Sequence, residues 1–102
     1  MEPELKAKWI AALRSGEIKQ GQNALINDEG AMCCIGVLGR VLGINDVALK
    51  RHARVIGGHG DKHPLQPIDD CGVTTESRYE LAGMNDGGKN FAEIADWIEA
   101  NL

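Results

Sequence analysis

Apolar residues recur at helical spacing near both ends of this sequence. Leu5, Trp9 and Leu13 lie four residues apart, which is typical of a helix with one buried face. The matching positions near the other end are Phe91, Ile94, Ala95, Ile98 and Leu102. A helix with a single apolar face must bury that face against another element. We therefore expect the first and last segments to pack into one common core.

Capping signals define the ends of these two helices. Pro3 suits the first turn of a helix, because its missing N–H would have no partner there, and the spacing predicts a helix over 3–15. Asn90, followed three residues later by Glu93, is a capping-box pattern. It predicts a final helix over 90–102.

A third apolar stripe predicts a helix over 34–42. Gly36 and Gly39 fall inside it, and each costs about 1 kcal/mol relative to Ala in a helix interior. We expect both to be tolerated because another element lies close against them. Two short helices are also expected, one capped by Asn45 or Asp46 and one over 76–82 capped by Thr74 or Thr75.

A β-hairpin is expected between the first two predicted helices. Apolar runs at 24–26 and 31–33 flank the turn sequence at 27–30, which ends in Gly. Strands this short need a helix to pack on. The expected fold is therefore α+β, with a small antiparallel sheet packed against the N-terminal, central and C-terminal helices. At this length residues 1–102 should form a single domain.

Cys33 and Cys34 are the residues best placed for catalysis. A helix that begins at this pair would favour the reactive thiolate. Free cysteine is also among the most buried residue types, so two packed thiols are the competing interpretation. Three cysteines, two of them adjacent, imply no disulfide framework and fit a reducing compartment. We expect that the protein is not an enzyme and that it binds no cofactor. The alternative is an enzyme that uses Cys33 or Cys34.

Residues 54–73 contain side chains that could bind a metal ion. His59 and His63 have the His-x-x-x-His spacing of zinc ligands, and Cys71 could add a third donor. Residues 57–64 are rich in Gly, which predicts a loop rather than a helix, and Pro67 disfavours a helix across Gln66. A loop does not keep two histidines on one face, so we predict no metal site.

The charge is spread unevenly along this acidic chain, whose net charge is −4. Residues 40–63 hold five Lys or Arg against two acids, and 64–102 hold two against eight. Lys50, Arg51 and Arg54 form a compact basic patch, which could dock a partner. Nucleic acid is not the expected partner, since the pI is about 5.3 and no aromatic residues interleave with the patch. A nucleic-acid-binding protein remains an alternative.

Two further positions are candidate contact sites. Trp97 lies about 100° from Ile98 on the final helix, where it either widens the core face or anchors a partner. Gly87 and Gly88 come just before the cap of that helix. They would allow an anion to approach the helix N-terminus, although a plain turn explains them as well.

Two stretches of the chain resemble a group of small uncharacterised proteins from bacteriophage genomes and prophages. The first, 9–38, includes Lys-Gln-Gly at 19–21 and Cys-Cys-Ile-Gly-Val-Leu at 33–38. The second, 81–98, includes Met-Asn-Asp at 84–86 and Asn-Phe-Ala-Glu-Ile-Ala-Asp-Trp-Ile at 90–98. The resemblance implies a phage or prophage origin and a setting in the bacterial cytoplasm, with no known activity. The function we expect is that of a small accessory protein that binds a host or phage macromolecule.

Overall fold

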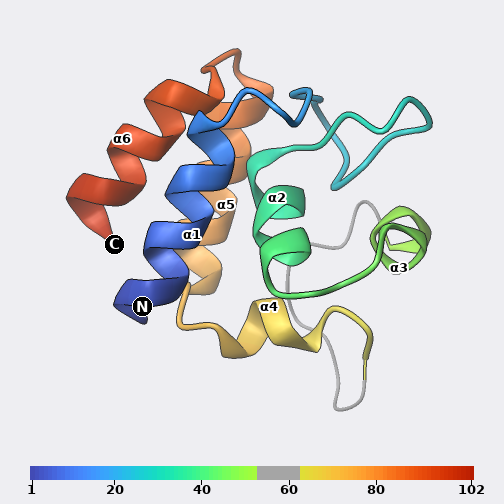
Figure 1. The fold of residues 1–102 in the computed structure, drawn as a ribbon, viewed down its shortest axis with the longest axis horizontal. Coiled ribbons are helices and arrows are strands. Elements are labelled where there is room, and N and C mark those ends of the chain that lie inside the picture. The colour runs from blue at the N-terminus through green and yellow to red at the C-terminus, as the bar shows by residue number, and fades with distance from the viewer. Residues whose placement is uncertain (53–62) are drawn as a thin grey trace.

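Six helices form the regular structure of residues 1–52 and 63–102, the parts of the chain that this computed structural model describes (Figure 1). They are α1 (Pro3–Arg14), α2 (Cys34–Val41), α3 (Asp46–Arg51), α4 (Gln66–Asp70), α5 (Thr75–Asp86) and α6 (Phe91–Asn101). Four of them form a ring in which α1 packs on α2 and α6, and α5 closes the other side. α3 and α4 both pack on α2. Across the described helices, none has the length and apolar character needed to cross a bilayer.

The expected α+β fold is wrong, because the described residues contain no strand and no sheet. Segments 24–26 and 31–33 meet only at an isolated bridge between Ile26 and Met32. The turn between them does form, with the Gly30 N–H donating to the Asn27 carbonyl at 3.0 Å. The physical reason is that Cys33 caps the start of α2, so the second run passes into a helix directly after the bridge and cannot extend into a strand.

Five helices were predicted and are confirmed, and the ends of α1, α2 and α6 differ from the prediction by one residue. The expectation that Pro67 prevents a helix across Gln66 is wrong, because Pro67 lies in the first turn of α4, where its missing N–H is not needed. Side chains cap the starts of four helices by accepting a backbone N–H, namely Cys33 at α2, Asn45 at α3, Thr74 at α5 and Asn90 at α6. The capping box of Asn90 and Glu93 is present with both of its hydrogen bonds. α5 is longer than predicted, because it continues through the expected turn at 84–88 as far as Asp86.

The core lies inside the ring of helices, where two glycines permit very close contacts. A Cβ on Gly36 would lie 1.9 Å from the carbonyl oxygen of Leu25, and one on Gly39 would lie 2.8 Å from Cδ2 of Leu49. The expected close approach at both glycines is therefore confirmed. Trp9 is fully buried beside them, and its indole N–H donates to the Cys34 carbonyl at 3.0 Å.

A buried amide joins parts of the chain that are far apart in sequence. The Asn85 side chain is fully buried, and its Oδ1 accepts from Gln20 Nε2 at 3.0 Å and from the Cys34 N–H at 3.2 Å. Its Nδ2 donates to the Gly21 carbonyl at 2.7 Å. Gln20 in turn accepts from the Phe91 N–H at 3.1 Å, at the start of α6. All five residues belong to the two stretches described above, so those motif residues are in direct contact.

Candidate functional site

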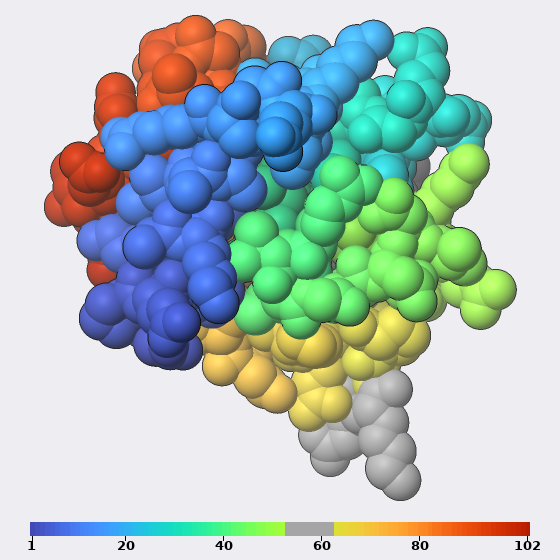
Figure 2. Space-filling model, viewed as in Figure 1, coloured from blue at the N-terminus to red at the C-terminus, as the bar shows by residue number. Residues whose placement is uncertain are grey.

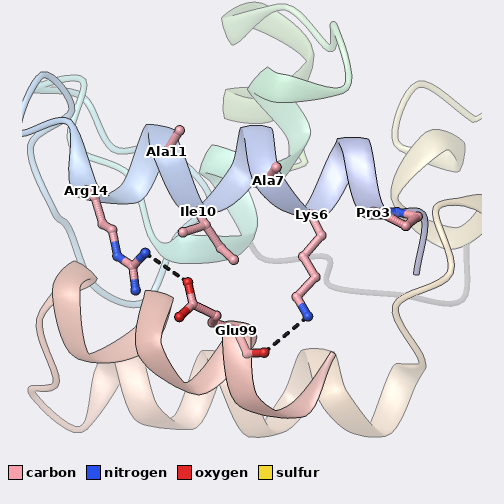
Figure 3. A pocket seen from close by; sticks show the side chains of 7 residues that line it. All are labelled: Pro3, Lys6, Ala7, Ile10, Ala11, Arg14 and Glu99. Atoms are coloured by element: carbon pink, nitrogen blue, oxygen red, sulfur yellow. Dashed lines mark hydrogen bonds and ion pairs between the residues drawn. The ribbon is translucent and has the colours of Figure 1, made fainter.

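A groove of about 470 Å³ runs along α1 beside α6 (Figure 3). It is lined by Pro3, Lys6, Ala7, Ile10, Ala11, Arg14 and Glu99. Pro3, Ala7 and Ala11 are four residues apart, so they share one side of the helix, and all three are exposed. α1 thus carries a second apolar stripe in addition to the one that faces the core.

Two cations reach across this groove from α1 to α6, on either side of Ile10 (Figure 3). Lys6 Nζ donates to the backbone carbonyl of Glu99 at 3.1 Å. Arg14 bonds to Asp96 at 2.7 Å and to the Glu99 carboxylate at 3.1 Å. Hydrogen bonds to Asp96 and then to Glu99 raise the pKa of Arg14, so it stays charged. The groove has charged ends and an apolar middle, an arrangement suited to binding rather than to catalysis.

This groove was not predicted from the sequence, although a signal was present. Ala7 and Ala11 repeat the four-residue spacing of the core stripe on another side of α1. Alanine, however, is the best helix former and is common on exposed helix surfaces. Alanines at this spacing therefore cannot be told apart from ordinary helix surface until the neighbouring helix is placed.

The basic patch lies on α3, away from the groove. Lys50 is exposed and lies 3.1 Å from Asp28 in an ion pair. Arg51 is also exposed, and Arg54 lies outside the described residues. Trp97 lies on α6, at the opposite side of the molecule from α3 (Figure 1), so the structure does not bring the predicted contact residues together.

Trp97 is half-buried and packs against the core cluster. This position at the edge of the core agrees with the interpretation that it widens the apolar face of α6. Part of the Trp97 ring is exposed to solvent. A role of Trp97 in contact with a partner therefore stays a prediction.

Gly87 and Gly88 lie at the end of α5, and their backbone donors are in use. The Gly87 N–H donates to the Gly83 carbonyl at 2.9 Å, and the Gly88 N–H donates to the Asn85 carbonyl at 3.3 Å. An anion bound there would have to replace these hydrogen bonds. The turn therefore has a structural explanation, and anion binding by the two glycines stays a prediction.

The adjacent cysteines are buried in an environment that disfavours a thiolate. Burial raises the pKa of Cys33, although its sulfur accepts from the Gly36 N–H at 3.4 Å. Burial raises the pKa of Cys34 further, and its thiol donates to the Leu81 carbonyl at 3.5 Å. A nucleophile needs the opposite shift and access to substrate. The geometry thus favours packed thiols over catalysis.

Thiol labelling at pH 7 tests this interpretation. Cys33 and Cys34 should react with a reagent such as DTNB only as the protein unfolds, whereas the half-buried Cys71 should react first in the native state. Variants with Cys71→Ser, or with both Cys33 and Cys34 replaced by Ala, assign each phase. Rapid native labelling of Cys33 or Cys34 would restore the enzyme hypothesis.

Of the two histidines with zinc-ligand spacing, only His63 lies among the described residues. Among residues 1–52 and 63–102 no three His, Cys, Asp or Glu side chains cluster as metal ligands. His63 packs its ring against His52, with centroids 4.4 Å apart, and its Nδ1 accepts from the Leu65 N–H at 3.0 Å. His59 lies outside the described residues.

Comparisons with known proteins give one family. A family model described as a domain of unknown function (DUF8296) matches residues 1–57, which include α1, α2 and α3. No curated protein and no solved structure matches the chain significantly. Because the family model covers more than half of the 102 residues, this protein belongs to the DUF8296 family.

Proposed function

We propose that this protein is a small phage or prophage accessory protein that acts in the bacterial cytoplasm by binding a partner protein in the α1 groove. The observation that carries this proposal is the second apolar stripe of α1, formed by Pro3, Ala7 and Ala11. The stripe is exposed, so it is not explained by the core of this chain. The likeness of the two sequence stretches to phage and prophage proteins supports the setting.

The residues that line the groove suit an amphipathic helix of the partner. Exposed alanines let another helix approach closely, and such helices bind through apolar residues three or four apart. Ile10, at the floor of the groove, offers an apolar contact near its centre. Lys6 bonds a backbone carbonyl rather than a carboxylate, so it is available to pair with an acidic residue of the partner. We expect a helix with a small apolar stripe and an acid at one end.

Substitution in the groove tests the proposal. Ala11→Arg should abolish capture of the partner from bacterial host lysate, because it fills the groove and adds a charge. The matched control is Ala92→Arg, which changes an exposed helical alanine of α6 outside the lining residues. With a purified partner, the loss in affinity should be about 30-fold or more, which corresponds to about 2 kcal/mol.

Site-specific cross-linking identifies the surface directly. A photoreactive amino acid at Ala7 should cross-link the same protein that the wild type captures, and one at Ala92 should not. Equal capture by the Ala11→Arg and Ala92→Arg variants would place the contact elsewhere. If the wild type captures no protein, the binding function itself is wrong.

A further inference from the structure

α2 and α3 are joined by a turn whose geometry is set by local interactions. The turn spans 42–45, and Gly43 has a φ of +90°, which favours glycine. The Ile44 N–H donates to the Gly39 carbonyl and the Gly43 N–H to the Arg40 carbonyl, both at 3.0 Å. These two bonds form a Schellman motif that ends α2. Asn45 then caps α3, so one helix stops and the next starts within four residues.

The two helices pack closely and at a steep angle. Leu49 of α3 is fully buried against Gly39 of α2, where no larger residue would fit without a shift. Ile44 is buried in the corner between them. In Figure 1, α2 lies in the plane of the view and α3 is seen nearly along its axis. Two helices at a steep angle, joined by a short turn that contains Gly, make a helix-turn-helix arrangement.

The outer face of α3 carries an apolar residue and two cations. Val47, Lys50 and Arg51 lie at positions i, i+3 and i+4, so they share one face of the helix. Val47 is 70% exposed, the larger fraction of the two large apolar side chains that are exposed among the described residues. α3 projects at the edge of the molecule in Figure 2, where another macromolecule can reach it.

Arg40 of α2 extends the positive charge of this surface. It pairs with Asp46 at 2.8 Å, as Lys50 pairs with Asp28 at 3.1 Å. The side chains of both pairs are at least 40% exposed, and such pairs are worth only about 0–1 kcal/mol. A phosphate can therefore displace either carboxylate at little cost. The ion pairs hold the cationic side chains in position, and these side chains can still bind a phosphate.

We propose that α2 and α3 form a helix-turn-helix that places Val47 against the groove of duplex DNA, with Arg40, Lys50 and Arg51 on the phosphates beside it. The net charge of −4 argued against nucleic acid, but charges more than about 10 Å away are largely screened in salt. The proposal goes beyond the protein-binding function and uses no residue of the α1 groove. Each can therefore fail without the other.

Fluorescence anisotropy with a labelled duplex of about 20 base pairs tests the proposal. Three phosphate contacts predict that affinity falls about 40-fold between about 50 and 200 mM salt. With Lys50→Gln and Arg51→Gln together, binding at low salt should weaken at least tenfold and the salt effect should shrink to about fourfold. The control, Lys8→Gln with Lys89→Gln, removes the same charge from α1 and from the start of α6.

Several outcomes would overturn the assignment. The first is that the wild type does not bind the duplex at low salt. The second is that the two double variants lose the same amount of affinity. The third is that polyglutamate competes with the protein-bound duplex as well as unlabelled DNA does, which would show that the surface binds anions in general. Circular dichroism shows whether each variant is folded. If the variant of Lys50 and Arg51 is not folded, the duplex is added to the wild type and the amide chemical shifts are mapped by NMR. Shift changes that lie only outside residues 40–52 would also exclude the proposal.

Discussion

Replacing Gly36 with Ala should lower the free energy of unfolding by about 3 kcal/mol, because the new Cβ would meet backbone. The nearest atoms are the carbonyl oxygen and carbon of Leu25, at 1.9 and 2.8 Å from the ideal Cβ position. Overpacking in a core costs about 1–3 kcal/mol, and a rigid neighbour places this site at the upper end. That loss is a large share of the 5–15 kcal/mol typical of whole domains. Urea denaturation measures it as a lower midpoint.

Two other glycines make this prediction specific. Gly83 lies within α5 with no atom near its Cβ position, so Gly83→Ala should stabilise the protein by about 0.5–1 kcal/mol. At Gly39 the close atom is the end of the Leu49 side chain, which can move, so Gly39→Ala should cost about 1 kcal/mol. If Gly36→Ala unfolds at the same midpoint as the wild type, the close contact between α2 and Leu25 is wrong.

Replacing Asn85 with Ala should cost about 3 kcal/mol or more. The change removes the acceptor for Gln20 Nε2 and the Cys34 N–H, and the donor to the Gly21 carbonyl. A buried polar group left without a partner costs about 1–3 kcal/mol, and three are affected here. Urea denaturation should show the loss. Hydrogen exchange of the Cys34 amide should also become faster, because that N–H loses its acceptor.

Asn101→Ala is the control for this experiment. Its amide is exposed and donates only to the Trp97 carbonyl one turn earlier, at 2.8 Å, so the change should be within about 0.5 kcal/mol. An Asn85→Ala variant as stable as Asn101→Ala would mean that the buried network does not hold the fold together.

The sequence was sufficient to predict the helices that carry strong local signals. Asn90 and Glu93 predicted the start of α6 because both of their hydrogen bonds are made within one turn. Pro3 and the spacing of Trp9 and Leu13 did the same for α1. These signals depend on residues a few positions apart, so the rest of the fold does not alter them.

The predicted β-hairpin is wrong because its sequence signals come from neighbouring residues. The contacts around these residues are made by segments that lie farther away in the sequence. Residues 24–26 and 31–33 have strand-like composition, and the turn at 27–30 forms as predicted. The N–H of Met32, however, donates to the Lys19 carbonyl at 2.9 Å, and its carbonyl accepts from the Gly21 N–H at 2.8 Å. Met32 thus forms one isolated bridge to the connector after α1 at Gln20 and another to Ile26, and neither extends into a strand. Only the packed chain brings that connector into reach.

The candidate surfaces were predictable in part. Lys50 and Arg51 stood out in sequence because they are adjacent cations in an otherwise acidic chain. The role of Asn85 could not be predicted, because its partners are more than fifty residues away in sequence. The α1 groove depends on α6, which lies at the other end of the chain. Features made by distant segments require the structure.

The pairing of α1 with α6 has a consequence for synthesis on the ribosome. α1 is translated well before α6, yet α1 has α6 as a main packing partner. The hydrogen bonds of the Gln20 side chain with Asn85 and Phe91 likewise form only after those two residues have been translated. A nascent chain therefore cannot close this core until α6 has left the exit tunnel. Until then the apolar face of α1 is open to chaperones, and truncated products should be rapidly degraded.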